Sequence, residues 1–194
     1  MRRLGFPAGL GHLLSPRSGN SMDSVLLSGL PWAADNDAYL AWSETRYMKM
    51  LDRIAGHNRC LFVVAPDVLA NPVKTRKLFD EWWPIISDRE LPIAYVSQDG
   101  EQSSSIPWEF ISALFVGGTT QWKLSHASKK LVVEAKRKGK WTHMGRVNHY
   151  KRLRTAFGWG IDSVDGTSMS RYGDTYLKEF LSFVHSLNAQ EVIP

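Results

Sequence analysis

Short apolar runs alternate with longer amphipathic segments along most of the chain. A continuous run such as Arg59–Ala65 is typical of a strand buried on both faces of a parallel sheet. We expect strands over residues 11–16, 24–28, 32–34, 59–65, 91–97, 113–116, 141–144 and 161–164. Apolar spacings of mostly three to five residues predict an amphipathic helix over residues 37–55. Further helices are expected over residues 72–86, 107–111, 125–138, 149–159 and 173–187.

Six of the expected strands end in polar or glycine-containing sequence, at Asp35, Asp67, Gln98, Gly118, Gly145 and Asp165. These ends follow one another at intervals of 20 to 32 residues, which suits a repeated strand-loop-helix unit and a parallel sheet. Two earlier apolar runs bring the strand count to eight, so we predict one compact (β/α)8 barrel domain spanning residues 1–194. The first two strands are the weakest, because no helix fits between them. An open doubly wound sheet is the alternative.

The composition is that of a globular protein, with 43% hydrophobic and 22% charged residues among 194. The single cysteine, Cys60, lies in an apolar run, which excludes an internal disulfide or a cysteine-rich zinc site and favours a reducing compartment. No apolar run reaches the roughly 18 residues that a membrane span requires. We therefore expect a cytoplasmic protein with no membrane segment and no bound metal.

The chain carries a net charge of +5. Much of the excess lies in two basic clusters, residues 129–140 and 146–154. Clusters of this kind are compatible with an anionic partner such as a nucleic acid. Charge runs on helices are more often solvated faces, so charge by itself is weak support for a nucleic-acid partner.

The predicted fold brings the polar strand ends together at one edge of the sheet. The carboxylates there repel one another and shift one another's pKa values, so that they can serve as nucleophile, general base and hydrogen-bond acceptor. Glycine at this edge allows a ligand close to the backbone, and a planar purine suits such a set. The residues concerned are Asp35, Asp67, Gln98, Gly117, Gly118, Gly145 and Asp165. A lone aspartate after a strand is also a common helix cap, and Gly117-Gly118 is also a common turn.

Other polar and aromatic residues are given structural roles. His143 lies within a strand and is expected to be a core histidine with satisfied hydrogen bonds. Asp162 is expected to flank its strand. The tryptophans are expected mainly in the core, and Trp122, just after the Gly-Gly turn, is the one considered for base stacking.

Six motifs in order carry a resemblance to a known family. They are WAADN at residues 32–36, VAPD at 64–67, YVSQDG at 95–100, FVGGTTQWK at 115–123, HMGRVN at 143–148 and DSVDGT at 162–167. Together they resemble the queuine/guanine tRNA-transglycosylase superfamily. Within it the chain is most similar to the DpdA-like DNA-guanine transglycosylases of phages and bacteria, which place 7-deazaguanines in DNA. The resemblance implies a TIM barrel and a double-displacement base exchange that needs no cofactor.

The resemblance also implies roles for individual residues. Asp165 would attack C1′ of deoxyguanosine and form a covalent deoxyribosyl intermediate, while Asp35 would act as general acid and base. Asp67, Gln98 and the Gly118 backbone would read the purine edge, with Gly145 in the pocket wall. Arg171 would hold a phosphate. Independently of the resemblance, Arg146 and Lys151 are basic residues near the predicted pocket mouth and are expected, with Arg171, to neutralise phosphates. The partners expected are therefore DNA and a free 7-deazaguanine base of the preQ0 type.

The chain departs from the tRNA-modifying enzymes in two respects. It lacks the three cysteines of their zinc subdomain, which favours DNA over tRNA as the substrate. The family's G-G-x-x-V-G-E motif is Gly117-Gly-Thr-Thr-Gln-Trp-Lys123 here, so details of base selectivity do not transfer. A phage-encoded enzyme of this kind would act in the host cytoplasm and help phage DNA to evade restriction.

Three other functions stay open. One is a tRNA-guanine transglycosylase-like activity. Another is a barrel that binds nucleic acid or a purine without turnover, as a recognition subunit. A small-molecule lyase or aldolase is less favoured, because no lysine lies at a strand end and no paired metal ligands are present. The inserted base, the DNA sequence context, the oligomeric state and the need for a partner ATPase are not specified by the sequence.

Overall fold

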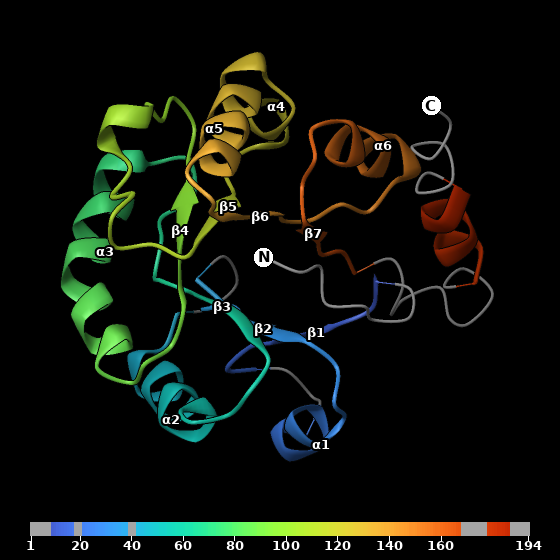
Figure 1. Cartoon of the computed structure of the whole chain (residues 1–194). Coiled ribbons are helices and arrows are strands. Elements are labelled where there is room, and N and C mark those ends of the chain that lie inside the picture. Colours follow the sequence, from blue (N-terminus) through green and yellow to red (C-terminus); the bar gives the residue numbers. More distant parts are fainter. Residues whose placement is uncertain (1–8, 18–20, 39–41, 168–177, 187–194) are drawn as a thin grey trace.

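A single parallel sheet of seven strands forms the centre of the computed structural model, which describes residues 9–17, 21–38, 42–167 and 178–186 (Figure 1). The strands are β1 (His12–Leu14), β2 (Trp32–Ala34), β3 (Cys60–Val64), β4 (Ile93–Ser97), β5 (Ala113–Val116), β6 (Trp141–Met144) and β7 (Ser163–Val164). They pair in chain order from β1 to β7, and every pair is parallel. A doubly wound sheet reverses its strand order at a switch point, so this alternative is wrong.

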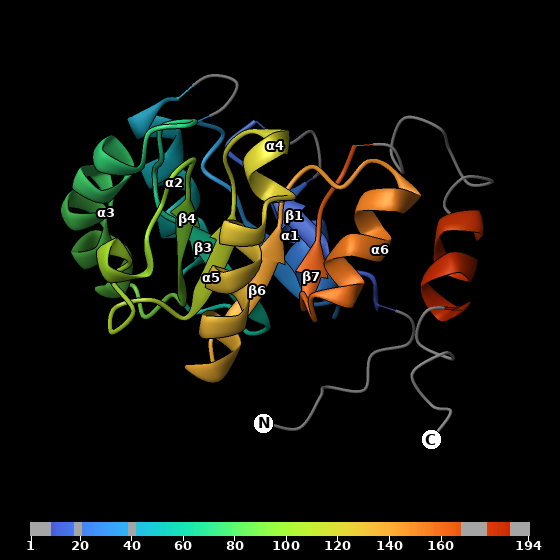
Figure 2. The same ribbon diagram turned by 90° about the horizontal axis from the view of Figure 1, so that it is seen from above.

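Helices cover the outer face of this curled sheet, as the two views in Figures 1 and 2 show. They are α1 (Met22–Leu27), α2 (Glu44–Ile54), α3 (Pro72–Ser87), α4 (Thr120–Lys123), α5 (His126–Arg137) and α6 (Tyr150–Gly158). Residues 178–186 are also helical, and Ser103–Ser105 form a 3₁₀ turn. None of the helices in the described residues is long and apolar enough to cross a bilayer.

The strand predicted over residues 24–28 is wrong, because this segment belongs to helix α1. Ser21 caps the helix by accepting a hydrogen bond from the Ser24 N–H at 3.5 Å. Met22, Val25 and Leu26 pack against the core, which is the i, i+3, i+4 spacing of a helix rather than the alternation of a strand. A helix therefore does fit between β1 and β2.

The eight-stranded closure predicted from the sequence is not present in the described residues. They contain seven strands, and no pairing joins β7 to β1 across the open side of the sheet. The fold shown is an α/β fold whose parallel sheet curls into a partial barrel (Figure 1).

Side chains alternate between the two faces of the curled sheet. On β3, Val63 points outward into the main core beneath the helices, whereas Phe62 and Val64 belong to a separate inner cluster. The Phe62 ring lies 5.0 Å from His143 of β6, which is not adjacent to β3 in the sheet. This contact crosses the hollow of the sheet, so its inner face is filled with side chains, as in a barrel interior.

Most other elements follow the predicted ranges, with four exceptions. The helix predicted over 107–111 is wrong, because residues 108–110 form only a turn. The helix predicted from residue 37 begins at Glu44, and β7 is limited to Ser163–Val164. Helix α4 was not predicted. Part of the helix expected over 173–187 lies outside the described residues.

Adjacent valines on α5 test which face of the helix packs against the sheet. Val132 is 0% exposed, whereas Val133 is 56% exposed. We expect Val132→Ala to lower the free energy of unfolding by about 2 kcal/mol, because it removes buried methyl groups and leaves a cavity. Val133→Ala, which makes the same change in helix propensity, should stay within about 0.5 kcal/mol of wild type. Urea denaturation of both variants measures the difference, and equal losses would contradict this packing.

Candidate active site

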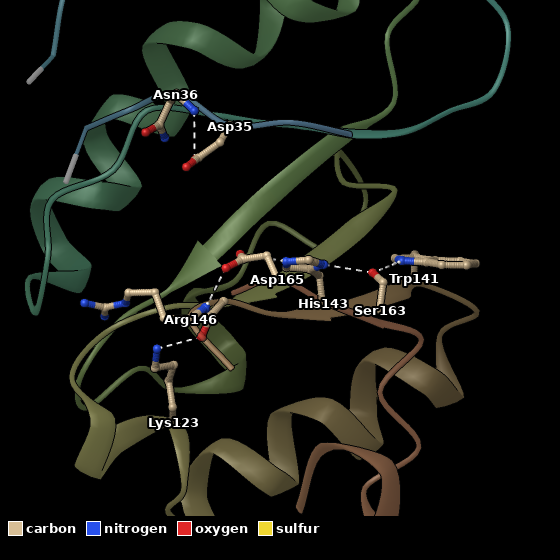
Figure 3. Close-up of polar contacts among 9 residues, drawn as sticks. Asp35, Asn36, Lys123, Trp141, His143, Arg146, Ser163 and Asp165 are labelled. Carbon is tan, nitrogen blue, oxygen red and sulfur yellow. Dashed lines mark hydrogen bonds and ion pairs between the residues drawn. The ribbon is translucent and has the colours of Figure 1, made fainter. Parts of the chain in front are cut away.

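The polar strand ends meet at one edge of the sheet, as the sequence predicts. Asp35 follows β2 and Asp67 comes shortly after β3, while Gln98 and Gly117 directly follow β4 and β5. Gly145 and Asp165 complete the set behind β6 and β7. Because all the strands run parallel in chain order, these positions share the edge at which α/β barrels carry their chemistry. In Figure 3 the side chains of Asp35 and Asp165 extend toward the same space.

Two donors hold the Asp165 carboxylate. The Arg146 backbone N–H donates to Oδ1 at 2.8 Å, and His143 Nε2 lies 3.1 Å from Oδ2. Burial alone would raise the pKa of Asp165. The hydrogen bond and electrostatic attraction of His143, the Arg146 N–H and the Lys123 cation outweigh burial and place this pKa below its ordinary value. Asp165 is therefore ionised at neutral pH.

The pKa of Asp35 is shifted in the opposite direction from that of Asp165. Burial raises its pKa to about 7, repulsion from Asp165, Asp67 and Asp37 adds to the shift, and the Asn36 N–H opposes it. That N–H donates to Oδ1 of Asp35 at 2.8 Å. A carboxyl group with this pKa can both give and take a proton near neutral pH.

The side chains of Asp67 and Gln98 are hydrogen-bonded to each other. Gln98 Nε2 donates to Oδ2 of Asp67 at 2.7 Å, and Asn36 Nδ2 donates to its Oδ1 at 2.9 Å. The Gln98 Oε1 accepts from the Ala70 N–H at 2.8 Å, so both ends of this buried amide have protein partners. Burial raises the pKa of Asp67, and both side-chain donors oppose that rise. In this structure Gln98 orients Asp67, and Asn36, which was missed from the sequence, does the same.

Neighbouring protein atoms leave no room for a Cβ at the three glycines of the site. A Cβ on Gly117 would lie 2.4 Å from a Val96 methyl, and one on Gly145 would lie 2.7 Å from the Phe115 ring. Gly118 has a φ of +71°, and a Cβ there would meet Asp99 at 2.4 Å. Close packing therefore explains these glycines without a ligand. The Gly145 position still borders the site, because its Cβ would stand 3.4 Å from Asp165 Oδ2.

Lys123 is a site residue that the sequence did not reveal. Helix α4, capped by Thr119, carries it back to the sheet, where its Nζ donates to the Gly145 carbonyl at 2.7 Å (Figure 3). The side chain is buried, and burial lowers its pKa to about 8, with the Arg146 and Arg152 cations adding and Asp165 opposing. No lysine directly follows a described strand, as expected from the sequence, but Lys123 reaches the site from a position seven residues past the end of β5. The sequence therefore counts against an aldolase-type lysine only at the strand ends themselves.

The remaining predicted residues have four different outcomes. Arg146 borders the site and donates from its guanidinium to the Gly118 carbonyl at 2.5 Å, and Lys151 is exposed at the start of α6. Arg171 lies outside the described residues. Trp122 is buried in the main core rather than presented for base stacking. Asp162 is confirmed as a flanking residue, since it accepts hydrogen bonds from the Thr142 N–H and hydroxyl at 2.8 Å.

Among the described residues, no group of three or more His, Cys, Asp or Glu side chains is arranged so that it could hold a metal ion. The chemistry available from these residues is that of two carboxyl groups with divergent pKa values, a buried lysine, and the hydrogen-bonded pair Asp67 and Gln98.

Comparisons with known proteins bear on the fold only. No protein-family model and no curated protein matches the sequence. Among solved structures, the Amycolatopsis orientalis BexX/CysO complex matches with a TM-score of 0.55 and 10% identity over 94% of this chain and 82% of that chain. An HpcH/HpaI aldolase from Desulfitobacterium hafniense DCB-2 matches with a TM-score of 0.43 and 12% identity, covering 96% and 94%. At such identities, activity has to be argued from the site.

The raised pKa of Asp35 predicts a pH-dependent stability. Because its folded pKa of about 7 exceeds its ordinary value, the folded state holds the proton more tightly, and stability is lost as the pH rises toward 7. Asp35→Asn removes this penalty, so the variant should gain on the order of 2 kcal/mol over wild type at pH 8 and little at pH 4. Urea denaturation at both pH values measures the gain.

Asp88→Asn, at the exposed C-cap of α3, is the control for that measurement. It makes the same chemical change away from the strand ends and should show no growing advantage at high pH. A gain for Asp35→Asn that is the same at pH 4 and pH 8 would contradict the raised pKa.

Proposed function

We propose that this protein is a base-exchange transglycosylase that replaces guanine in DNA with a 7-deazaguanine of the preQ0 type, in the cytoplasm. The observation that carries the proposal is the pair Asp165 and Asp35, two carboxyl groups at one sheet edge whose pKa values are driven apart. One is ionised and the other titrates near neutral pH, which is the division that acid and nucleophile roles require. The six motifs that resemble the transglycosylase superfamily support the same assignment.

In the first half-reaction, an Asp165 oxygen attacks C1′ of the target deoxyguanosine. The C1′–N9 bond breaks, a glycosyl ester forms on Asp165, and the departing guanine takes a proton from Asp35. The target base has to leave the helical stack for this attack, at a cost of a few kcal/mol.

In the second half-reaction, the incoming 7-deazaguanine gives its N9 proton to the Asp35 carboxylate. Its nitrogen then attacks C1′, the ester bond breaks and Asp165 leaves as the carboxylate. Two displacements at the same carbon retain its configuration, as in retaining glycosidases. Asp35 returns to its protonated state, so no cofactor is consumed.

Asp67 is the residue we assign to base recognition. Guanine presents an N1–H and an amino group on one edge, and a carboxylate can accept from both. Asn36 and Gln98 each donate to Asp67 and so fix its orientation. We therefore give Gln98 an orienting role in place of direct contact with the purine.

The proposal includes a complete (β/α)8 barrel. The sequential parallel order of β1 to β7, the curl of the sheet and its filled inner face support a barrel of which these seven strands are the larger part. The BexX/CysO likeness supports the shared fold of the described strands.

A covalent adduct is the sharpest test of the proposed reaction. Wild-type protein incubated with guanine-containing DNA and then denatured should gain the mass of the DNA strand without one guanine. Asp165→Asn should form no adduct and release no guanine, and Asp35→Asn should slow adduct formation by about 10²- to 10⁴-fold. Intact-mass spectrometry and guanine release measure these outcomes.

Asp88→Asn serves again as the control, because it removes a carboxylate far from the strand ends and should form the adduct at the wild-type rate. Exchange of labelled guanine by Asp165→Asn would contradict the assignment of Asp165 as the nucleophile. Tight binding of DNA by wild type with neither adduct nor exchange would instead favour a binding protein without turnover.

DNA binding should depend on the basic start of α6. Lys151 is exposed there, next to the strand ends, whereas Arg137 lies in the last turn of α5, at the opposite edge. Lys151→Gln should weaken binding and reduce the slope of log K against log salt by about 0.7 to 0.9 for each phosphate that is no longer neutralised. Arg137→Gln removes the same charge and should leave the slope unchanged. Fluorescence anisotropy across a salt series distinguishes them, and equal slopes for both would place the DNA elsewhere.

A further inference from the structure

A row of three side chains leads along β6 and β7 to Asp165 (Figure 3). The Trp141 Nε1 donates to Ser163 Oγ at 2.8 Å, and this Oγ lies 2.8 Å from His143 Nδ1. His143 Nε2 lies 3.1 Å from Asp165 Oδ2. The row is continuous because β6 and β7 pair in a register that sets His143 opposite Ser163.

The two ends of the row set the direction of its hydrogen bonds. The Trp141 indole N–H can only donate, so Ser163 Oγ accepts from it, and the ionised Asp165 carboxylate can only accept, so His143 Nε2 carries a proton and donates a hydrogen bond to it. In the neutral imidazole Nδ1 is then an acceptor, and it receives the hydroxyl hydrogen bond of Ser163. With the other neutral tautomer, the Nε2 lone pair would face the carboxylate lone pairs, which is unfavourable.

The surroundings of His143 fix its ring plane. Its centroid is 4.7 Å from that of Phe115 and 5.0 Å from that of Phe62, and only 4% of the residue is exposed. Aromatic packing prevents the ring from turning away, and a buried hydrogen bond is stronger than an exposed one. The core histidine expected from the sequence is therefore also tied to the candidate nucleophile.

We propose that Trp141, Ser163 and His143 are positioning residues that hold the Asp165 carboxylate in one orientation and as the anion. This inference rests on the proposed function, in which Asp165 is the nucleophile. The same Nε2–H also favours the second half-reaction, because it stabilises the carboxylate that leaves when the ester bond to C1′ breaks. In the proposed reaction the members of the row act through Asp165, to which His143 connects them.

Other charged groups act on Asp165 directly or through a neighbour and set the background for any titration. Asp35, directly after β2, and Lys123 of α4 act on Asp165 itself, while Asp67 acts on Asp35 and Arg146 acts on Lys123. Variants of the row leave all four in place, so a change in titration reports the loss of the row itself.

The test compares His143→Leu, which removes the donor, with His143→Gln, whose amide nitrogen can replace Nε2–H. The ¹³C resonance of the Asp165 carboxyl group, followed against pH in the full chain, should titrate at higher pH in His143→Leu, and His143→Gln should restore most of the shift. Guanine exchange should show a kcat lower by about 10- to 100-fold in His143→Leu with KM for DNA nearly unchanged. An unchanged titration midpoint would overturn the inference.

Trp141→Phe is the second variant, for the case that His143→Leu fails to fold, because it removes the indole N–H while it keeps a smaller aromatic ring at this position. It should raise the Asp165 midpoint by less than His143→Leu does, and an unchanged midpoint would count against the row. The titration does not depend on activity. A shifted midpoint in a protein whose wild type exchanges no guanine would support the row and refute the proposed function.

Discussion

The gathering of buried carboxylates at one edge of a parallel sheet is the constraint on which the rest of this site depends. Each ionised carboxylate removed from water has to be compensated by donors or cations, or else keep its proton. Asp67 receives two side-chain amides, and Asp165 receives an imidazole, a backbone N–H and the field of Lys123. Asp35 receives one backbone N–H and faces the other carboxylates, so it holds its proton up to about pH 7. The separation of acid from nucleophile follows from this unequal distribution of donors.

The strand ends were predictable from the sequence because a buried strand changes from apolar to polar or glycine residues where it leaves the core. Apolar runs that stop at Asp35, Gln98 or Gly145 mark the ends of strands in the sequence. Because the strands are all parallel and lie in chain order, these ends meet at one edge of the sheet. Helix α1 is not evident from the sequence because the apolar run that suggests a strand begins only at Ser24. Met22 lies just before that run and supplies the first member of the helical spacing.

Partners across strands were not predictable, because they depend on register rather than on local pattern. His143 looked like an ordinary core residue until its pairing with Ser163 placed both of its nitrogens in a row leading to Asp165. Lys123 was missed because a four-residue helix carries it back to the Gly145 carbonyl. Gln98 was found correctly at a strand end, but its bonds to Asp67 and Ala70, and hence its orienting role, were visible only in three dimensions.

Register also explains why Asp162 matters although it is not at the strand end that carries chemistry. β7 contains only two residues, and a slip of one position would turn each of its side chains to the opposite face. Asp162 accepts from both the N–H and the hydroxyl of Thr142 and pairs with Lys136 at 2.5 Å, which ties the entry of β7 to β6 and to α5. With that entry fixed, Ser163 faces His143, and Asp165 emerges two residues later in reach of the same ring. The flanking aspartate thus secures the alignment that the nucleophilic aspartate requires.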